Sequence, residues 1–365
     1  MNKSCLIGFL MCSAFSLVVQ AATDGAHITK TISQIERKKG IKRTIQYRPD
    51  GNDFVCVNGK NRYTRALYGG ITDFRIETSD RPVFATYKPK DSKHICFRLQ
   101  CGNQSIALDS LKFCEARYRA GRRTYRLTDP LLGKGELNIS VLAFPDAEGG
   151  IWRFTMKDMP EGALLHCYIS EIRAKNLSRN GDMGADRADS FGAPQLPKEQ
   201  KHYKLSLDGT TAYIVVEDQE LRLPALVEGT SLYDKSEKWR SEIESSLQIS
   251  TPDPYFNPLG GALAAAADGI WDGKIWLHGA IGWRSQLNGW RAAYIGDFIG
   301  WHDRARTHFD SYAASQVTDV PATIPHPTQD TALHLARSVK KWGTPHYSNG
   351  YICRTPYRKD QMHHY

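Results

Sequence analysis

The sequence predicts an antiparallel β-sandwich followed by an α-helical region, and three observations carry this prediction. Between about residues 24 and 230, short β-rich runs alternate with turn signals and helical periodicity is scarce. From about residue 231, segments with helical periodicity take over. The chain has 365 residues, more than the ~250–300 at which a single core stops growing, so we expect more than one domain.

Residues 1–21 have the features of a secretory signal peptide. Lys3 supplies a positive start, an apolar run extends from Cys5 to Val19, and Val19-Gln20-Ala21 resembles a cleavage site. The run is too short for a comfortable transmembrane helix, although an uncleaved anchor is the alternative. We therefore expect a secreted or periplasmic protein with no later membrane span.

The net charge of +9 invites a nucleic-acid interpretation. The basic clusters are small, however, and an exported protein does not meet nucleic acid as its usual partner. A solvated basic face is the simpler interpretation, and attraction to acidic glycans is the more specific one. We expect no nucleic-acid partner.

Residues 22–230 are predicted to form the β-sandwich domain. Apolar residues alternate in two segments, as expected of strands with one buried face. They are Leu137, Ile139, Val141 and Ala143 in the first segment, and Ala212, Ile214 and Val216 in the second. Turn signals such as Pro49-Asp50-Gly51, Asn58-Gly59 and Asp208-Gly209 separate the runs. Many short strands over this length indicate an antiparallel sandwich.

Two segments of this domain are rich in polar residues. Residues 58–69 carry more polar and aromatic side chains than a plain strand needs, so they either line a site or form a turn with an amphipathic strand. Residues 181–197 contain Asp182, Asp186 and Asp189. They either bind calcium or form a solvated loop, and their spacing favours the loop.

Six cysteines follow the predicted signal peptide: Cys56, Cys96, Cys101, Cys114, Cys167 and Cys353. Their spacing fits no zinc site and no compact disulfide scaffold. Export permits disulfides, so a bridge between Cys96 and Cys101 and a set of buried free thiols are both open.

The second part of the chain is predicted to be helical. Residues 231–250 form a linker helix with Trp239, Ile243 and Leu247 on one face. Prolines break the pattern near residue 252, after which residues 257–268 and 328–342 are expected to be helices.

Residues 288–308 are the strongest candidate for a binding site. Tryptophan, arginine, aspartate and histidine side chains lie close together there, whereas a helix that only fills a core seldom carries so many polar groups. Flat aromatic rings beside charged groups suit a sugar. The predicted substrate-binding residues are Trp290, Arg291, Trp301, His302 and Arg304. On one continuous helix, Trp290, Tyr294, Asp297, Trp301, Arg304 and His308 would form a single stripe.

Asp297 and Asp303 are the candidate catalytic carboxylates, because glycoside hydrolysis ordinarily uses two carboxyl groups. On one continuous helix they would point about 120° apart, although Gly296 and Gly300 can break that geometry. The alternatives are a helix cap for Asp297 and an ion pair with Arg304 or Arg306 for Asp303.

The segments TPDPYFN, GAIGWR and NGWRAAYIGDFIGWHDRARTHF, together with the preceding β-rich domain and linker helix, resemble secreted bacterial six-hairpin glycosidase-like proteins. The resemblance implies a β-sandwich followed by an (α/α)6 barrel whose loops hold the sugar, and a glycoside hydrolase-like activity on an unspecified poly- or oligosaccharide. Such a barrel needs on the order of 300 residues. We therefore expect residues 251–365 to be only its N-terminal part, with the partner carboxylate elsewhere.

The expected function is O-glycosyl hydrolysis during polysaccharide degradation if the full barrel is present. A non-catalytic carbohydrate-binding protein and an inactive fragment are the alternatives. The sequence shows no nucleotide, flavin or metal motif, so we expect a carbohydrate partner and no cofactor.

Overall fold

The computed structural model describes residues 46–88, 91–172, 202–277 and 289–316, and the pairs 326–327 and 342–343. Three predicted segments lie wholly or almost wholly outside the described residues. These are the signal peptide (1–21), the acidic loop (181–197) and the helix at 328–342, of which only Trp342 is described.

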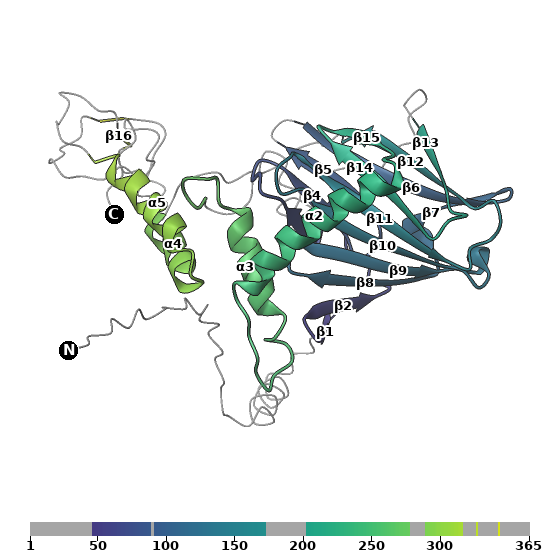
Figure 1. Cartoon of the computed structure of the whole chain (residues 1–365), viewed down its shortest axis with the longest axis horizontal. Helices are drawn as coiled ribbons and strands as arrows, with labels where there is room; N and C mark the ends of the chain where they lie inside the picture. The colour runs from purple at the N-terminus through teal and green to yellow at the C-terminus, as the bar shows by residue number, and fades with distance from the viewer. Residues whose placement is uncertain are drawn as a thin grey trace, which may run out of the picture.

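Two antiparallel sheets stack face to face among the described residues (Figure 1). The larger sheet has the order β1-β2-β8-β9-β10-β11-β14-β15. Its strands are β1 Arg48–Asp50, β2 Asp53–Val57, β8 Phe113–Arg119, β9 Arg122–Thr128, β10 Glu136–Ala143, β11 Gly149–Lys157, β14 Thr211–Glu217 and β15 Glu220–Arg222. The smaller sheet has the order β13-β12-β6-β5-β4-β3, with β7 paired to β6. Its strands are β3 Arg65–Tyr68, β4 Arg75–Thr78, β5 Phe84–Lys88, β6 Asp91–Cys101, β7 Gln104–Ala107, β12 Leu164–Glu171 and β13 His202–Ser206. The predicted β-sandwich is therefore confirmed.

The core between the sheets is apolar and aromatic. The predicted alternation in β10 is confirmed, because Leu137, Ile139 and Val141 are all buried in this core. Phe84 packs edge-to-face against Trp152, with ring centroids 5.7 Å apart. Such edge-to-face pairs add to the hydrophobic gain from burying large rings.

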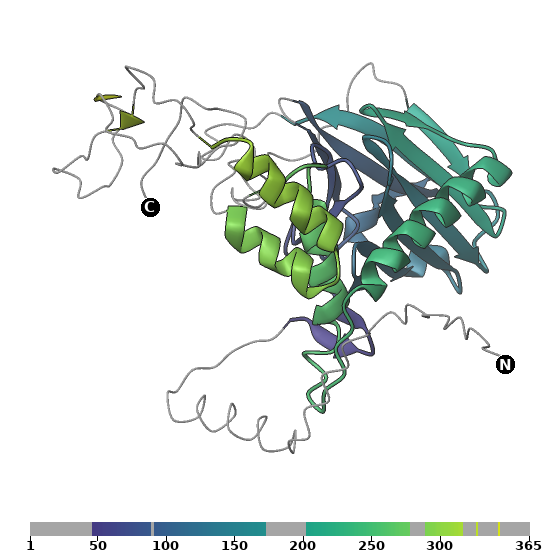
Figure 2. The same cartoon turned by 60° about the vertical axis from the view of Figure 1, so that its left-hand side comes forward.

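Helix α2 (Leu226–Ser245) covers the outer face of the larger sheet, lying across β10, β11 and β14 (Figures 1 and 2). Tyr233 of α2 packs there against Ile151 and Val215, which point away from the sandwich core. Strands with both faces buried lose the polar half of the alternating pattern, which explains the continuous run Ile214-Val215-Val216. A side chain at Gly229 would overlap the Tyr213 ring, so glycine allows the close approach of helix and sheet.

The predicted linker helix is present, but it begins and ends about five residues earlier than residues 231–250. Its fully buried face holds Tyr233, Ser236 and Arg240, whereas Trp239 and Ile243 are half-buried. Trp239 and Ile243 instead line a pocket. Of the three residues predicted to share one face of this helix, Trp239 and Ile243 do so, whereas Leu247 lies beyond the helix end at Ser245.

Three further helices follow: α3 Leu259–Gly269, α4 Gly289–Phe298 and α5 His302–Ala313. The predicted helix at 257–268 corresponds to α3 within two residues. Trp342 and Gly343 form β17, a two-residue strand paired with β16 (His326–Pro327), so the predicted helix does not extend to Trp342. None of the helices in the described part of the chain could span a bilayer.

The described cysteines are free thiols. Cys96 and Cys101 both lie on β6, five positions apart on one extended strand, which rules out a bridge between them. Burial raises the pKa of Cys96 to about 11 and that of Cys114 to about 12, so these thiols are inert. Cys353 lies outside the described residues.

Candidate functional site

The predicted site segment is not one continuous helix. Helix α4 ends at Phe298, Gly300 adopts a positive φ of 84°, and α5 begins at His302. The expected stripe is therefore wrong. Tyr294 is exposed, whereas His308 is fully buried.

The two predicted catalytic carboxylates lie on different helices. Asp297 is in the last turn of α4, where its Oδ1 lies 2.8 Å from Nδ1 of His302, and both side chains are mostly exposed. Its position excludes the helix N-cap that the sequence suggested as an alternative. The Asp303 side chain is 98% exposed and lies 3.7 Å from Arg306. Neither carboxylate lines the two cavities described below.

The predicted substrate-binding residues divide in the same way. Trp301 and Arg304 come together, because the Arg304 guanidinium lies 4.4 Å from the centre of the Trp301 ring. His302 is on the exposed side with Asp297. Trp290 and Arg291 are in the first turn of α4, and their side chains lie outside the described set.

Arg304 contacts a residue that was not among the candidate site residues predicted from the sequence. Its Nη1 donates a hydrogen bond of 2.7 Å to Oδ1 of Asp268, at the end of α3. Asp268 is only 7% exposed, and burial raises the pKa of its carboxyl while Arg304 opposes that rise. A helix C-terminus disfavours a negative charge. An aspartate in the last turn of an alanine-rich helix is therefore unfavourable for the helix alone. This position could have marked Asp268 as a candidate site residue from the sequence.

Asp268 lines a pocket of about 160 Å³ between the sandwich and the helices, which we call the junction pocket. The other principal side chains are Arg65 and Tyr68 from β3, Tyr118 from β8, and Trp239 and Arg240 from α2. Residues 58–69 therefore do contribute to a cavity, as one of the two interpretations of that segment predicted. Aromatic rings beside charged groups in a small concave site are typical of sites for small polar ligands.

The pocket wall near Arg65 is held by aromatic contacts. The Arg65 guanidinium lies 4.9 Å from the Tyr47 ring centre and 5.7 Å from that of Tyr118. A planar guanidinium that already packs against aromatic rings loses less conformational entropy when a ligand binds than a guanidinium that is free in water. Arg65 is thus oriented before any ligand enters.

A chain of alternating charges joins α2 to the β8–β9 hairpin. It runs from Arg119 through Glu244, Arg240 and Glu237 to Arg122, with donor–acceptor distances of 2.7–2.8 Å at each step. We call this the ion-pair chain. Burial disfavours the charged form of Glu244, but hydrogen bonds from Arg119 and Arg240 outweigh it and lower the pKa of this carboxyl. The chain fixes α2 where it borders the junction pocket.

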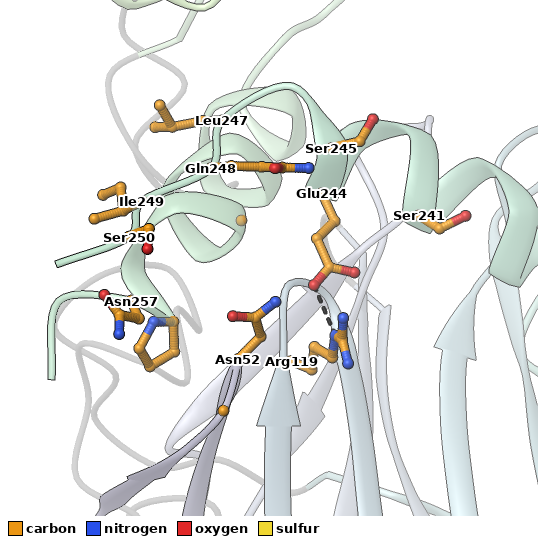
Figure 3. A pocket seen from close by; sticks show the side chains of 13 residues that line it. Asn52, Arg119, Ser241, Glu244, Ser245, Leu247, Gln248, Ile249, Ser250 and Asn257 are labelled. Atoms are coloured by element: carbon orange, nitrogen blue, oxygen red, sulfur yellow. Dashed lines mark hydrogen bonds and ion pairs between the residues drawn. The ribbon is translucent and has the colours of Figure 1, made fainter. Parts of the chain in front are cut away.

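On the other side of the ion-pair chain lies a second and larger cavity, the polar cavity, of about 450 Å³ (Figure 3). Its walls come from the β1–β2 turn, Arg119, the end of α2, the loop 246–250 and the start of α3. Within the described ranges, no group of three or more His, Cys, Asp or Glu side chains is placed to hold a metal ion.

The fold and these cavities define a β-sandwich protein with an attached helical layer and small polar cavities along their junction. Residues 89–214, roughly a third of the chain, match the model of a family described as a domain of unknown function (DUF4450). The match begins just before β6 and ends within β14, inside the sandwich. No curated protein matches the chain.

Proposed function

We propose that this is a glycoside hydrolase-like protein that binds a poly- or oligosaccharide outside the cytoplasm, with one sugar unit in the junction pocket. The observation that carries the proposal is the buried carboxyl of Asp268 beside Trp239, Tyr68 and Tyr118 in one cavity. Carboxylate and guanidinium groups hydrogen-bond to sugar hydroxyls, and aromatic rings pack on the apolar face of a sugar ring. At about 160 Å³ the pocket is smaller than the roughly 300–1,000 Å³ of typical small-molecule sites, so the proposal is limited to one sugar ring and not a longer segment.

The helical layer is consistent with the (α/α)6 architecture that the sequence resemblance implies. Helices α4 and α5 contact each other and are joined by only three residues, as in a helical hairpin. Leu263, Phe298 and Phe309 on α3, α4 and α5 are large apolar side chains that remain exposed. Apolar faces of this kind are expected where helices pack on further helices. We propose that α3 to α5 belong to such a barrel.

Binding and hydrolysis are separable outcomes of this proposal. Hydrolysis ordinarily needs two carboxyl groups, and Asp268 is the single carboxyl among the described residues that line the junction pocket. Burial raises the pKa of the Asp268 carboxyl and Arg304 opposes that rise, and a carboxyl group can accept hydrogen bonds from sugar hydroxyls in either form. Sugar binding is therefore the part of the function that the pocket supports best, and acid–base catalysis by Asp297 and Asp303 stays a prediction.

The test is a titration with neutral and acidic oligosaccharides. Tryptophan fluorescence measures binding, and chromatography of the products measures hydrolysis. We expect Trp239→Ala and Asp268→Asn each to weaken binding about tenfold or more, since each removes a central contact. Matched controls are Tyr255→Ala and Asp310→Asn, which change exposed residues outside the pocket. Thermal melting of each variant separates lost binding from lost folding.

Product release would establish a glycosidase, and binding without products would establish a carbohydrate-binding protein. If no oligosaccharide binds, or if the controls and the pocket variants lose binding equally, the junction pocket is not a sugar site.

A further inference from the structure

We propose that the polar cavity is a second and separate ligand site, which takes a neutral, hydroxyl-rich ligand such as a monosaccharide or disaccharide unit. Among the described residues, this site and the junction pocket have no lining residue in common. Its occupancy therefore does not depend on the proposed role of Asp268.

The size of the cavity fits such a ligand. A volume of about 450 Å³ lies within the roughly 300–1,000 Å³ of typical small-molecule sites. The cavity is bounded by four separate parts of the chain, and Figure 3 shows side chains from opposite walls facing one another across it. A ligand there would be contacted from several directions.

The polar groups on the walls match the hydrogen bonding of sugar hydroxyls. Asn52 and Gln248 approach the cavity from opposite walls (Figure 3), and neither side-chain amide is hydrogen-bonded to another described residue. Each amide offers donors and an acceptor, as a pair of neighbouring hydroxyls requires. The hydroxyls of Ser241 and Ser245 donate to carbonyls of their own helix, so their oxygens can still accept.

The charge of the cavity argues for a neutral ligand. Of the described residues on its wall, Arg119 is the cation, and its Nε donates a 2.7 Å hydrogen bond to Glu244, which cancels its charge locally. An anionic ligand would therefore gain little attraction. A wholly apolar ligand would remove Asn52 and Gln248 from water without replacing their hydrogen bonds, which is costly. Leu247, Ile249 and Pro258 provide apolar contact for sugar C–H groups.

The walls are held in place before a ligand binds. Asn257 accepts from the Thr251 backbone N–H at 2.8 Å and donates back to the Thr251 carbonyl at 3.3 Å, which closes one wall. Arg117 binds Asp50 at 2.8 Å and Asp53 at 3.3 Å, on either side of the turn that carries Asn52. Walls fixed in this way reduce the entropy lost on binding.

The experiment is isothermal titration of the full chain with glucose, galactose, mannose, maltose and cellobiose, with glucuronate as the charged comparison. For a sugar that binds, Asn52→Ala and Gln248→Ala should each weaken affinity about twofold to tenfold, the value of one net hydrogen bond. Both residues are exposed, so the variants should fold. The matched control is Gln104→Ala, an exposed amide on β7 outside the cavity, and it should leave affinity unchanged.

Three results would overturn the proposal: no saturable binding of any neutral sugar, unchanged affinity in the Asn52→Ala, Gln248→Ala double variant, or tighter binding of glucuronate than of glucose. Failure here is distinguishable from failure of the junction pocket. Sugar binding that is lost in Trp239→Ala but kept in the double variant would support the junction pocket alone.

Discussion

The sandwich has one large apolar core, whereas the apolar cluster in the described part of the helical layer is small and centres on Trp276. In the sandwich, rings such as Phe84, Phe97 and Trp152 pack edge-to-face in an apolar core, and the buried ion pair of Arg75 with Glu77 adds to it. In the helical layer, buried positions hold Arg240 and Asp268, each in an ion pair. Both described cavities lie along α2, where this helix borders the sandwich, and not between the two sheets.

The comparison predicts the largest effect in the sandwich core. Trp152 is fully buried among Phe84 and Phe97, so Trp152→Ala should lower the free energy of unfolding by about 3–5 kcal/mol. Urea unfolding followed by circular dichroism measures this change. Trp152→Phe keeps most of the apolar volume and should cost clearly less. An equal loss for both variants would show that cavity formation is not the cause.

The ion-pair chain should give the next largest effect. Glu244→Gln leaves the buried Arg240 with one carboxylate partner in place of two, and we expect a loss of about 2–3 kcal/mol. The folded pKa of Glu244 is lowered, so its stabilisation is present above the unfolded value of about 4.5 and disappears as the pH falls through the folded value.

The pH dependence provides the check on this assignment. The difference in melting temperature between the wild type and Glu244→Gln should shrink as the pH falls below about 4.5. Glu220→Gln, at an exposed position on β15, is the matched control and should show no such trend. A difference that stays constant with pH would show that the Glu244 charge does not stabilise α2.

A smaller and local effect is expected where α4 packs on the segment after α3. A side chain at Gly296 would overlap the Trp276 ring, so Gly296→Ala should displace α4 at a cost of about 1–3 kcal/mol. Hydrogen exchange should accelerate in residues 289–316 while the sandwich strands stay protected. Gly209→Ala, where nothing lies within 4 Å of the new methyl group, is the control. Faster exchange in the sandwich as well would mean that the two regions unfold together.

The smallest effect on stability is expected at Asp303, whose side chain is 98% exposed. Asp303→Asn should change the free energy of unfolding by less than about 0.5 kcal/mol. A role in acid–base catalysis would instead appear as a loss of about 100-fold or more in hydrolysis of a bound oligosaccharide. Unchanged stability with unchanged hydrolysis in an active preparation would remove Asp303 from the catalytic candidates.

Local patterns in the sequence were enough to predict that this region is β-rich and where several of its strands and turns lie. The alternation from Leu137 to Val141 and the turn at Pro49-Asp50-Gly51 depend on neighbours along the chain, and both appear in the structure as predicted. The helix at 257–268 was predictable for the same reason, because alanine favours helix whatever it packs against.

The candidate site was only partly predictable. Arg304 and Trp301 were expected to act together and do lie in contact. Their assumed neighbours Asp297 and His308 separate because the chain turns at Gly300, where a positive φ ends the helix. A periodicity argument cannot place side chains correctly once the helix it assumes is broken.

The sequence by itself determined the strands, the approximate helices and the polar character of the 288–308 segment, since these follow from local propensity and composition. Only the tertiary structure decided that Arg65, Trp239 and Asp268 meet in one pocket, and that Glu244 of α2 meets Arg119 of β8. Arg65 and Arg119 are far from these partners along the chain. Their approach is fixed by the packing of α2 and α3 on the sandwich, which no local pattern encodes.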